Sequence, residues 1–148
     1  MTLPKDLREF VELLDSLRIE YLVVGSFAVA KHGHPRSTGD IDLLVRTSLE
    51  NATKLQDAFN AFGLESLGLK AEDFQSPGQI IQIGRPPNRI DIMTSISGVE
   101  FEEAWASREV GEIDGVPTLF ISKELLVRNK RATGRAKDLA DLAELEGA

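Results

Sequence analysis

Two aspartates one residue apart, Asp40 and Asp42, stand directly before the aliphatic run LLV. Burying an unpaired carboxylate costs on the order of several kcal/mol, so both side chains must face water, accept strong hydrogen bonds or bind a cation. If residues 40–45 form a strand, both project from one face, roughly 6–7 Å apart along the backbone, and their tips can converge on one metal ion. A lone D-x-D pattern is more typical of solvent-facing acids, so the choice depends on other residues.

Two further features favour the metal interpretation. Asp91 is a single acid in the apolar run RIDIMTSI, and a hairpin strand placed beside residues 40–45 would bring it to the same edge. The β-rich run 21–24 stops at Gly25 and Ser26, where a helix begins, and free backbone N–H groups at a helix N-terminus suit a phosphate. Three acids beside a phosphate-binding turn describe a divalent-metal site for phosphoryl or nucleotidyl transfer.

The elements that must position these residues follow from periodicity and turn residues. Helices are predicted over residues 3–18, 26–33 (with Ser26 as the N-cap), 48–63 (with Ser48 as the N-cap), 101–107, and 123–145 divided near Gly134. Strands are predicted over residues 21–24, 40–45, 79–84, 89–96 and on either side of the Asp114-Gly115 turn, with residues 64–78 as mixed loop. The resulting order is α-β-α-β-α-β-β-α-β-β-α-α, which predicts an α+β (mixed α/β) fold with helices over a small mixed sheet.

The composition and net charge limit the number of domains and the classes of function that the chain can have. A chain of 148 residues with 42% hydrophobic content suits one domain over residues 1–148, with a core of about 1–121 and a helical C-terminal part of about 122–148. A net charge of -7 argues against a surface built for non-specific nucleic-acid binding, although a local basic patch fits. The absence of cysteine excludes disulfides and thiolate chemistry. No membrane span or signal peptide is indicated, so we expect a cytoplasmic protein.

These residues carry a family resemblance. VVGS, thirteen intervening residues and DIDLLV resemble the G-S…D-x-D signature of the DNA polymerase β-type nucleotidyltransferase superfamily, and RIDIM resembles its third acid-bearing strand. GRAKDLADL resembles the C-terminal R-x-K-D-x-x-D motif of AbiEii-type nucleotidyltransferase toxins from abortive-infection and toxin–antitoxin systems. The resemblance spans residues 21–141, and the length resembles that of a minimal, stand-alone relative.

The resemblance implies a nucleotidyltransferase-like fold and a role for each acid. Asp40 and Asp42 would bind Mg²⁺ (or Mn²⁺) that also touches the nucleotide phosphates, and Asp91 would complete a second metal position and serve as the base. An acceptor hydroxyl attacks the α-phosphate of a nucleoside triphosphate (NTP), and pyrophosphate leaves. This chemistry depends mainly on positioning and charge neutralisation, which metals and cations can supply.

Nucleotide contacts are expected from the glycine turn and from cationic residues. Arg36 precedes the first acid, where it would meet a phosphate or bond to loop carbonyls. The basic cluster near the C-terminus would contact the triphosphate or the acceptor, or would be a solvated helix surface. The expected nucleotide-binding residues are Gly25, Ser26, Arg36, Lys130, Arg135, Lys137 and Asp138.

Several functions fit this pattern. The chain could be a toxin acting on tRNA ends, an antitoxin that modifies a partner protein, or a small-molecule (aminoglycoside-like) nucleotidyltransferase. A catalytically inactive nucleotide-binding or interaction module is a fourth alternative. We expect an active Mg²⁺-dependent enzyme that uses an NTP and a tRNA or protein acceptor, with a cognate toxin or antitoxin as a potential partner, because all three acids are present.

Overall fold

The computed structural model describes residues 5–33, 40–85 and 88–147. Its elements follow the predicted order, with two short 3₁₀ helices added between α3 and β3. They are α1 (Lys5–Ser16), β1 (Tyr21–Val24), α2 (Gly25–His32), β2 (Asp40–Val45), α3 (Leu49–Ala61), η1 (Glu65–Leu67), η2 (Ala71–Phe74), β3 (Ile80–Arg85), β4 (Asn88–Met93), α4 (Phe101–Ala106), β5 (Glu109–Ile113), β6 (Val116–Phe120), α5 (Lys123–Thr133) and α6 (Ala136–Glu146).

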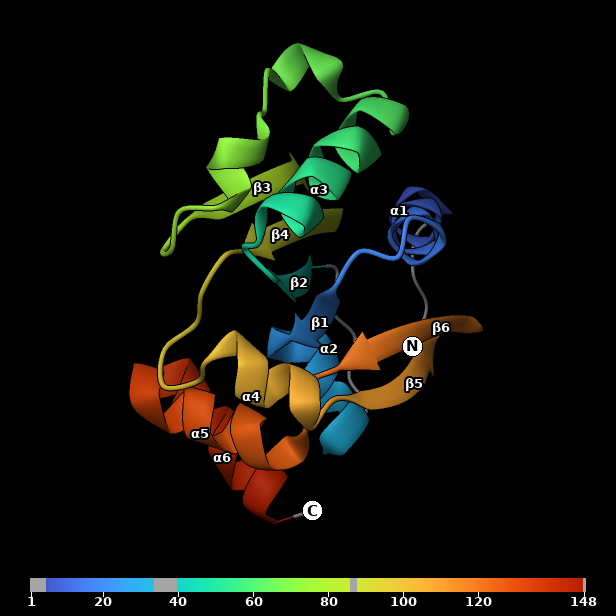
Figure 1. Ribbon diagram of the computed structural model, residues 1–148. Coiled ribbons are helices and arrows are strands. Elements are labelled where there is room, and N and C mark those ends of the chain that lie inside the picture. The colour runs from blue at the N-terminus through green and yellow to red at the C-terminus, as the bar shows by residue number, and fades with distance from the viewer. Residues whose placement is uncertain (1–4, 34–39, 86–87, 148) are drawn as a thin grey trace.

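The strands form one six-stranded sheet in the order β3-β4-β2-β1-β6-β5. The β2–β4 and β1–β6 pairs are parallel, and the other three pairs are antiparallel, so the sheet is mixed as predicted. The β3–β4 hairpin lies beside β2, which confirms the placement of the strand that carries Asp91. In Figure 1, α1 and α3 lie on one side of the sheet, whereas α4, α5 and α6 lie on the other.

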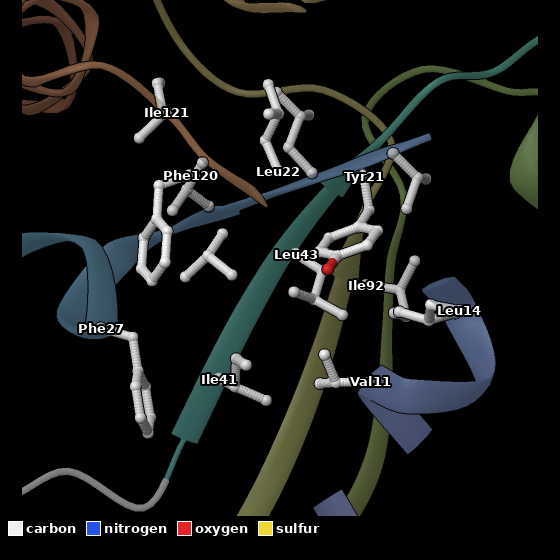
Figure 2. Packing of buried hydrophobic residues seen from close by; sticks show 14 of the residues in the cluster. Val11, Leu14, Tyr21, Leu22, Phe27, Ile41, Leu43, Ile92, Phe120 and Ile121 are labelled. Carbon is white, nitrogen blue, oxygen red and sulfur yellow. The ribbon is translucent and has the colours of Figure 1, made fainter. Parts of the chain in front are cut away.

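Side chains along the central strands alternate between the two faces of the sheet. Tyr21, Leu43 and Ile92 are fully buried, and they face Val11 and Leu14 of α1 in Figure 2. The residues between them on each strand point the opposite way, because successive strand side chains alternate between the two faces. The acids of β2 and β4 are therefore directed toward the side of the sheet that α5 and α6 cover.

One predicted helix cap is confirmed and the other is wrong. Ser48 caps α3, since its Oγ accepts a hydrogen bond from the backbone N–H of Asn51. Ser26 does not cap α2: the helix begins at Gly25, and Val24 holds the cap position without a side-chain hydrogen bond. The physical reason is that Gly25 takes a φ of 67°, so the chain turns from strand to helix at the glycine itself.

Two other local predictions concern the turns and loops. The turn between β5 and β6 has positive φ at both Asp114 and Gly115, which is the geometry expected of a tight two-residue hairpin. The predicted mixed loop 64–78 contains η1 and η2, because Phe74 is anchored in the core against Phe59 of α3. Among the described residues, no helix has the length and apolar character needed to cross a lipid bilayer.

Candidate active site

The turn between β1 and α2 is in contact with the second aspartate of β2. In the antiparallel β1–β2 pair, Val24 lies opposite Asp42. A Cβ atom built on Gly25 would lie 2.1 Å from Asp42 Oδ2, and the positive φ also disfavours any other residue. The glycine is therefore required by the close approach of the backbone to this carboxylate, and the phosphate contact expected from the sequence stays a prediction.

The structure brings the three predicted acids to one edge. In the parallel β2–β4 pair, Asp42 lies opposite Asp91, and Asp40 lies opposite Arg89. Asp91 is buried, with 5% of its surface exposed, while Asp40 and Asp42 are partly exposed. Two carboxylates are thus held side by side, with Asp91 buried and Asp42 facing the pocket.

This crowding has an electrostatic consequence at Asp42. The pKa of its carboxyl group is raised to about 7, first by burial and then by a hydrogen bond with Asp91 and the charges of Asp91 and Asp40. The positive charge of Lys137 acts in the opposite direction. A carboxylate that is hard to ionise beside other carboxylates fits a cation, because a cation would relieve both the burial cost and the repulsion.

Arg89 is a functional candidate that the sequence patterns did not single out. Its Nε–H donates to Asp91 Oδ1 at 2.9 Å and its Nη2 donates to Asp91 Oδ2 at 3.1 Å, while Nη2 also lies 3.4 Å from Asp40 Oδ2. The available signal was the spacing R-I-D, which places the arginine on the same strand face as Asp91.

Within the described residues, no three His, Cys, Asp or Glu side chains are gathered closely enough to hold a metal ion.

A pocket of about 470 Å³ opens beside Asp42. The sheet side of its lining includes Gly25, Ser26 and Asp42, and its apolar wall is formed by Ile80, Met93 and Ile96. The opposite side comes from α5 and α6, with Asn129, Lys130, Ala132, Thr133, Arg135 and Lys137. The pocket therefore joins the glycine turn, an acid and the C-terminal basic cluster in one cavity.

Within the C-terminal cluster, one lysine is buried between two acids. Lys130 Nζ lies 3.2 Å from Asp138 Oδ1 and 3.2 Å from Asp141 Oδ2. All three side chains are buried, so the cluster joins α5 to α6 through charges shielded from water. Lys130 lines the pocket, but its ammonium group is already engaged by the two carboxylates.

Asp138 also orients a second cation, Arg135. Arg135 Nε–H donates to Asp138 Oδ2 at 2.7 Å, and the Thr133 hydroxyl donates to the same oxygen at 2.5 Å. Burial alone would raise the pKa of Asp138, but hydrogen bonds from Arg135, Thr133 and Lys130 outweigh it and hold the pKa well below its usual range. Asp138 is therefore a fixed anion beneath the exposed Arg135.

The other predicted contacts are placed as follows. Lys137 lines the pocket on the same side as Arg135, and it is close enough to influence Asp42. Arg131, which belongs to the same sequence cluster, instead forms an ion pair with Glu146. Arg36 lies outside the described residues.

Comparison with known proteins identifies the family. The model of the aminoglycoside-2''-adenylyltransferase family matches residues 6–145, nearly the whole length of the chain. The chain belongs to this family. It is thus a member of the nucleotidyltransferase superfamily, as the G-S…D-x-D resemblance indicated. No curated protein matches the chain significantly.

Solved structures share the fold at low sequence identity. A protein from Thermotoga maritima, described as a nucleotidyltransferase by inference, is similar with a TM-score of 0.61 and 19% identity, covering 99% of this chain and 96% of that one. The lincosamide antibiotic adenylyltransferase LnuA, solved with lincomycin bound, has a TM-score of 0.54 and 16% identity, covering 98% and 97%. A nucleotidyltransferase-like antigen from Paracoccidioides brasiliensis has a TM-score of 0.53 and 19% identity, covering 98% and 76%. These likenesses confirm the predicted nucleotidyltransferase-like fold.

Proposed function

We propose that this protein transfers a nucleoside monophosphate from an NTP to a hydroxyl acceptor and releases pyrophosphate, with Mg²⁺ (or Mn²⁺) as the cofactor. The observation that carries the proposal is the pocket in which Asp42, the Gly25-Ser26 turn and Lys137 meet. A metal-binding acid, a helix N-terminus and a cation are the three kinds of group that bind a triphosphate.

The acids of β2 and β4 would hold the metal. Asp40 and Asp42 are its proposed ligands, with Asp91 beside them, and the excess negative charge at Asp42 supports this assignment. A divalent ion bound there would neutralise phosphate charge and align the reacting phosphate. Ionised carboxylate oxygens are the ligands that Mg²⁺ prefers.

The remaining groups would bind the nucleotide and move a proton. Backbone N–H groups at the start of α2 suit a phosphate, and Lys137 and Arg135 would pair with the outer phosphates. Asp138 keeps Arg135 in place. Asp91 would accept the proton of the attacking hydroxyl, because the hydrogen bonds from Arg89 use only one lone pair of each carboxylate oxygen.

The acceptor that we propose first is a tRNA end or a protein side chain, in a toxin–antitoxin or abortive-infection setting with a cognate partner. A small-molecule acceptor is the second candidate, because the family is described by an aminoglycoside-modifying activity and LnuA binds lincomycin. The wall of Ile80, Met93 and Ile96 offers apolar contact to either class.

The decisive experiment measures where the label goes. The protein is incubated with each α-³²P-labelled NTP and Mg²⁺, together with bulk tRNA, cell lysate, an aminoglycoside or a lincosamide, and both label transfer and pyrophosphate are quantified. We expect labelled product with wild type and none with Asp42→Asn, while Asp57→Asn, which changes an exposed acid of α3, keeps full activity. If no acceptor is labelled and no pyrophosphate is released by folded wild type, the protein is an inactive binding module instead.

A further inference from the structure

The Arg89 guanidinium lies between two acids on neighbouring strands, Asp91 of β4 and Asp40 of β2. Arg89 is partly exposed, whereas Asp91, its main partner, is 7% exposed at the side chain. Both oxygens of Asp91 are engaged by two different nitrogens of the guanidinium, and the Nη2 group also reaches Asp40 on the neighbouring strand. One fixed positive charge thus joins β4 to β2 within the catalytic edge.

The strand register makes this arrangement a built feature of the sheet. Asp40 lies directly opposite Arg89 in the parallel pair, and Asp91 lies two residues further along the same face of β4. A planar guanidinium matches a carboxylate in geometry, so the two-point contact with Asp91 fixes the orientation of both side chains. Asp42 is left outside these contacts of Arg89, and it faces the pocket.

The local charges indicate how many metal ions the site can take. When a bound cation keeps all three carboxylates ionised, Arg89 offsets one of their negative charges and a single divalent cation offsets the other two, before the positive charge of Lys137 is counted. A second divalent ion next to Asp91 would have to displace Arg89 or share a carboxylate with it, and two neighbouring cations repel each other, most strongly beside the buried Asp91. The contacts of Arg89 therefore disfavour a second ion on the Asp40–Asp91 side.

We propose that Arg89 is a built-in cation that takes the place of a second metal ion beside Asp91, so that the protein binds a single divalent ion, held by Asp42 and Asp40. This inference rests on the proposed metal-dependent function and goes beyond it, because it assigns a positioning role to a residue outside the D-x-D signature. In the alternative interpretation Arg89 is only a strand-to-strand ion pair, and its removal would lower stability without changing the number of metal ions bound.

Counting bound Mn²⁺ by electron paramagnetic resonance tests the proposal without depending on activity. The full chain is titrated with Mn²⁺ in the presence of α,β-methylene-ATP, and every Mn²⁺ held by the protein–nucleotide complex is counted, including an ion shared with the nucleotide. A titration of the nucleotide without protein identifies the Mn²⁺ held by free nucleotide. We expect one Mn²⁺ per wild-type chain and two per Arg89→Gln chain. Arg89→Lys retains the charge and should remain at one.

A matched control is Arg46→Gln, which removes another arginine at the sheet. Arg46 pairs with Glu20 and Glu102 at the opposite end of β2, away from the pocket. The Arg46→Gln chain should bind one Mn²⁺, as the wild-type chain does, even if its melting temperature falls. Thermal melts of every variant separate a loss of fold from a change in metal count.

Each outcome supports or overturns the proposal. Two Mn²⁺ per wild-type chain would overturn it, and so would a folded Arg89→Gln variant that still binds one. If the Arg89→Gln variant does not fold, the numbers of Mn²⁺ ions bound by wild type and by Arg89→Lys test the proposal instead. A wild-type chain that binds no Mn²⁺ under these conditions would overturn the proposed metal-dependent function as well, so the two failures are distinguishable.

Discussion

Asp42 and Asp91 lie directly opposite each other on the parallel strands β2 and β4, and the Asp91 carboxyl group contributes, after burial, to the raised pKa of Asp42. Two ionised carboxylates at directly opposite strand positions repel each other, so the pair requires a proton or a cation between the two groups. The pair is therefore both the proposed catalytic centre and a source of instability when the metal is absent.

The pair predicts a pH-dependent stability of the metal-free protein. The pKa is 3.8 for an unperturbed aspartate and about 7 for Asp42 in the folded chain, so the folded state binds the proton more tightly. The free energy of unfolding should therefore fall as pH rises from about 4 to about 7. The Asp42→Asn variant cannot ionise at this position. Its free energy of unfolding should be higher than that of wild type by about 1–3 kcal/mol at pH 8, and this difference should shrink toward pH 4.

Urea unfolding in EDTA at several pH values measures this difference. Asp57→Asn is the control, because Asp57 is exposed on α3 and should show no comparable trend. A difference between Asp42→Asn and wild type that stays constant from pH 4 to pH 8 would contradict the assignment.

Gly25→Ala should lower both the stability of the protein and its affinity for Mn²⁺. The added Cβ would meet Asp42 Oδ2 at 2.1 Å, and the positive φ adds strain of about 1 kcal/mol. Gly63→Ala is a matched control, since Gly63 also has a positive φ but no atom lies within 4 Å of the place that its Cβ would take. We expect Gly25→Ala to lose more stability than Gly63→Ala and to lose Mn²⁺ affinity in addition. Equal losses of stability, with unchanged Mn²⁺ affinity, would show that only the turn matters.

Lys137→Ala tests the proposed triphosphate contact. A charged hydrogen bond shielded from water contributes roughly 1.5–3 kcal/mol, so kcat/KM should fall by roughly tenfold to a hundredfold with little change in melting temperature. Arg135→Ala should show a similar loss, because Arg135 lines the same pocket. Arg131→Ala is the control, since Arg131 pairs with Glu146 at an exposed position. Steady-state kinetics within twofold of wild type for both Lys137 and Arg135 variants would assign this motif to the helix surface.

Lys130→Met should act mainly on stability. It removes the cation that Asp138 and Asp141 share, and the loss of one partner from a buried ion pair costs about 3–5 kcal/mol. Urea unfolding should show this loss, whereas Arg131→Ala should change the free energy of unfolding by about 0–1 kcal/mol. A stable Lys130→Met protein with a raised KM for NTP would instead make Lys130 a direct nucleotide contact.

Much of the fold could be predicted from the sequence because its signals are local. The spacing of apolar residues indicated α1, the Ser48 cap indicated α3, and the Asp114-Gly115 turn indicated the hairpin that joins β5 and β6. The D-x-D spacing placed Asp40 and Asp42 on one strand face, because that relationship depends only on the period of a strand. Such local patterns do not depend on how the elements are arranged in space.

Tertiary structure decided the rest, since the decisive contacts join residues far apart in the chain. The contact between Arg89 and Asp40 depends on the register of two parallel strands, which no local pattern specifies. The burial of Lys130 between two acids of α6 depends on how two helices pack. The sequence by itself determined which charged groups were present and which face each occupied. Only the packing of the elements decided which of these charges neutralise one another and which are left to bind a ligand.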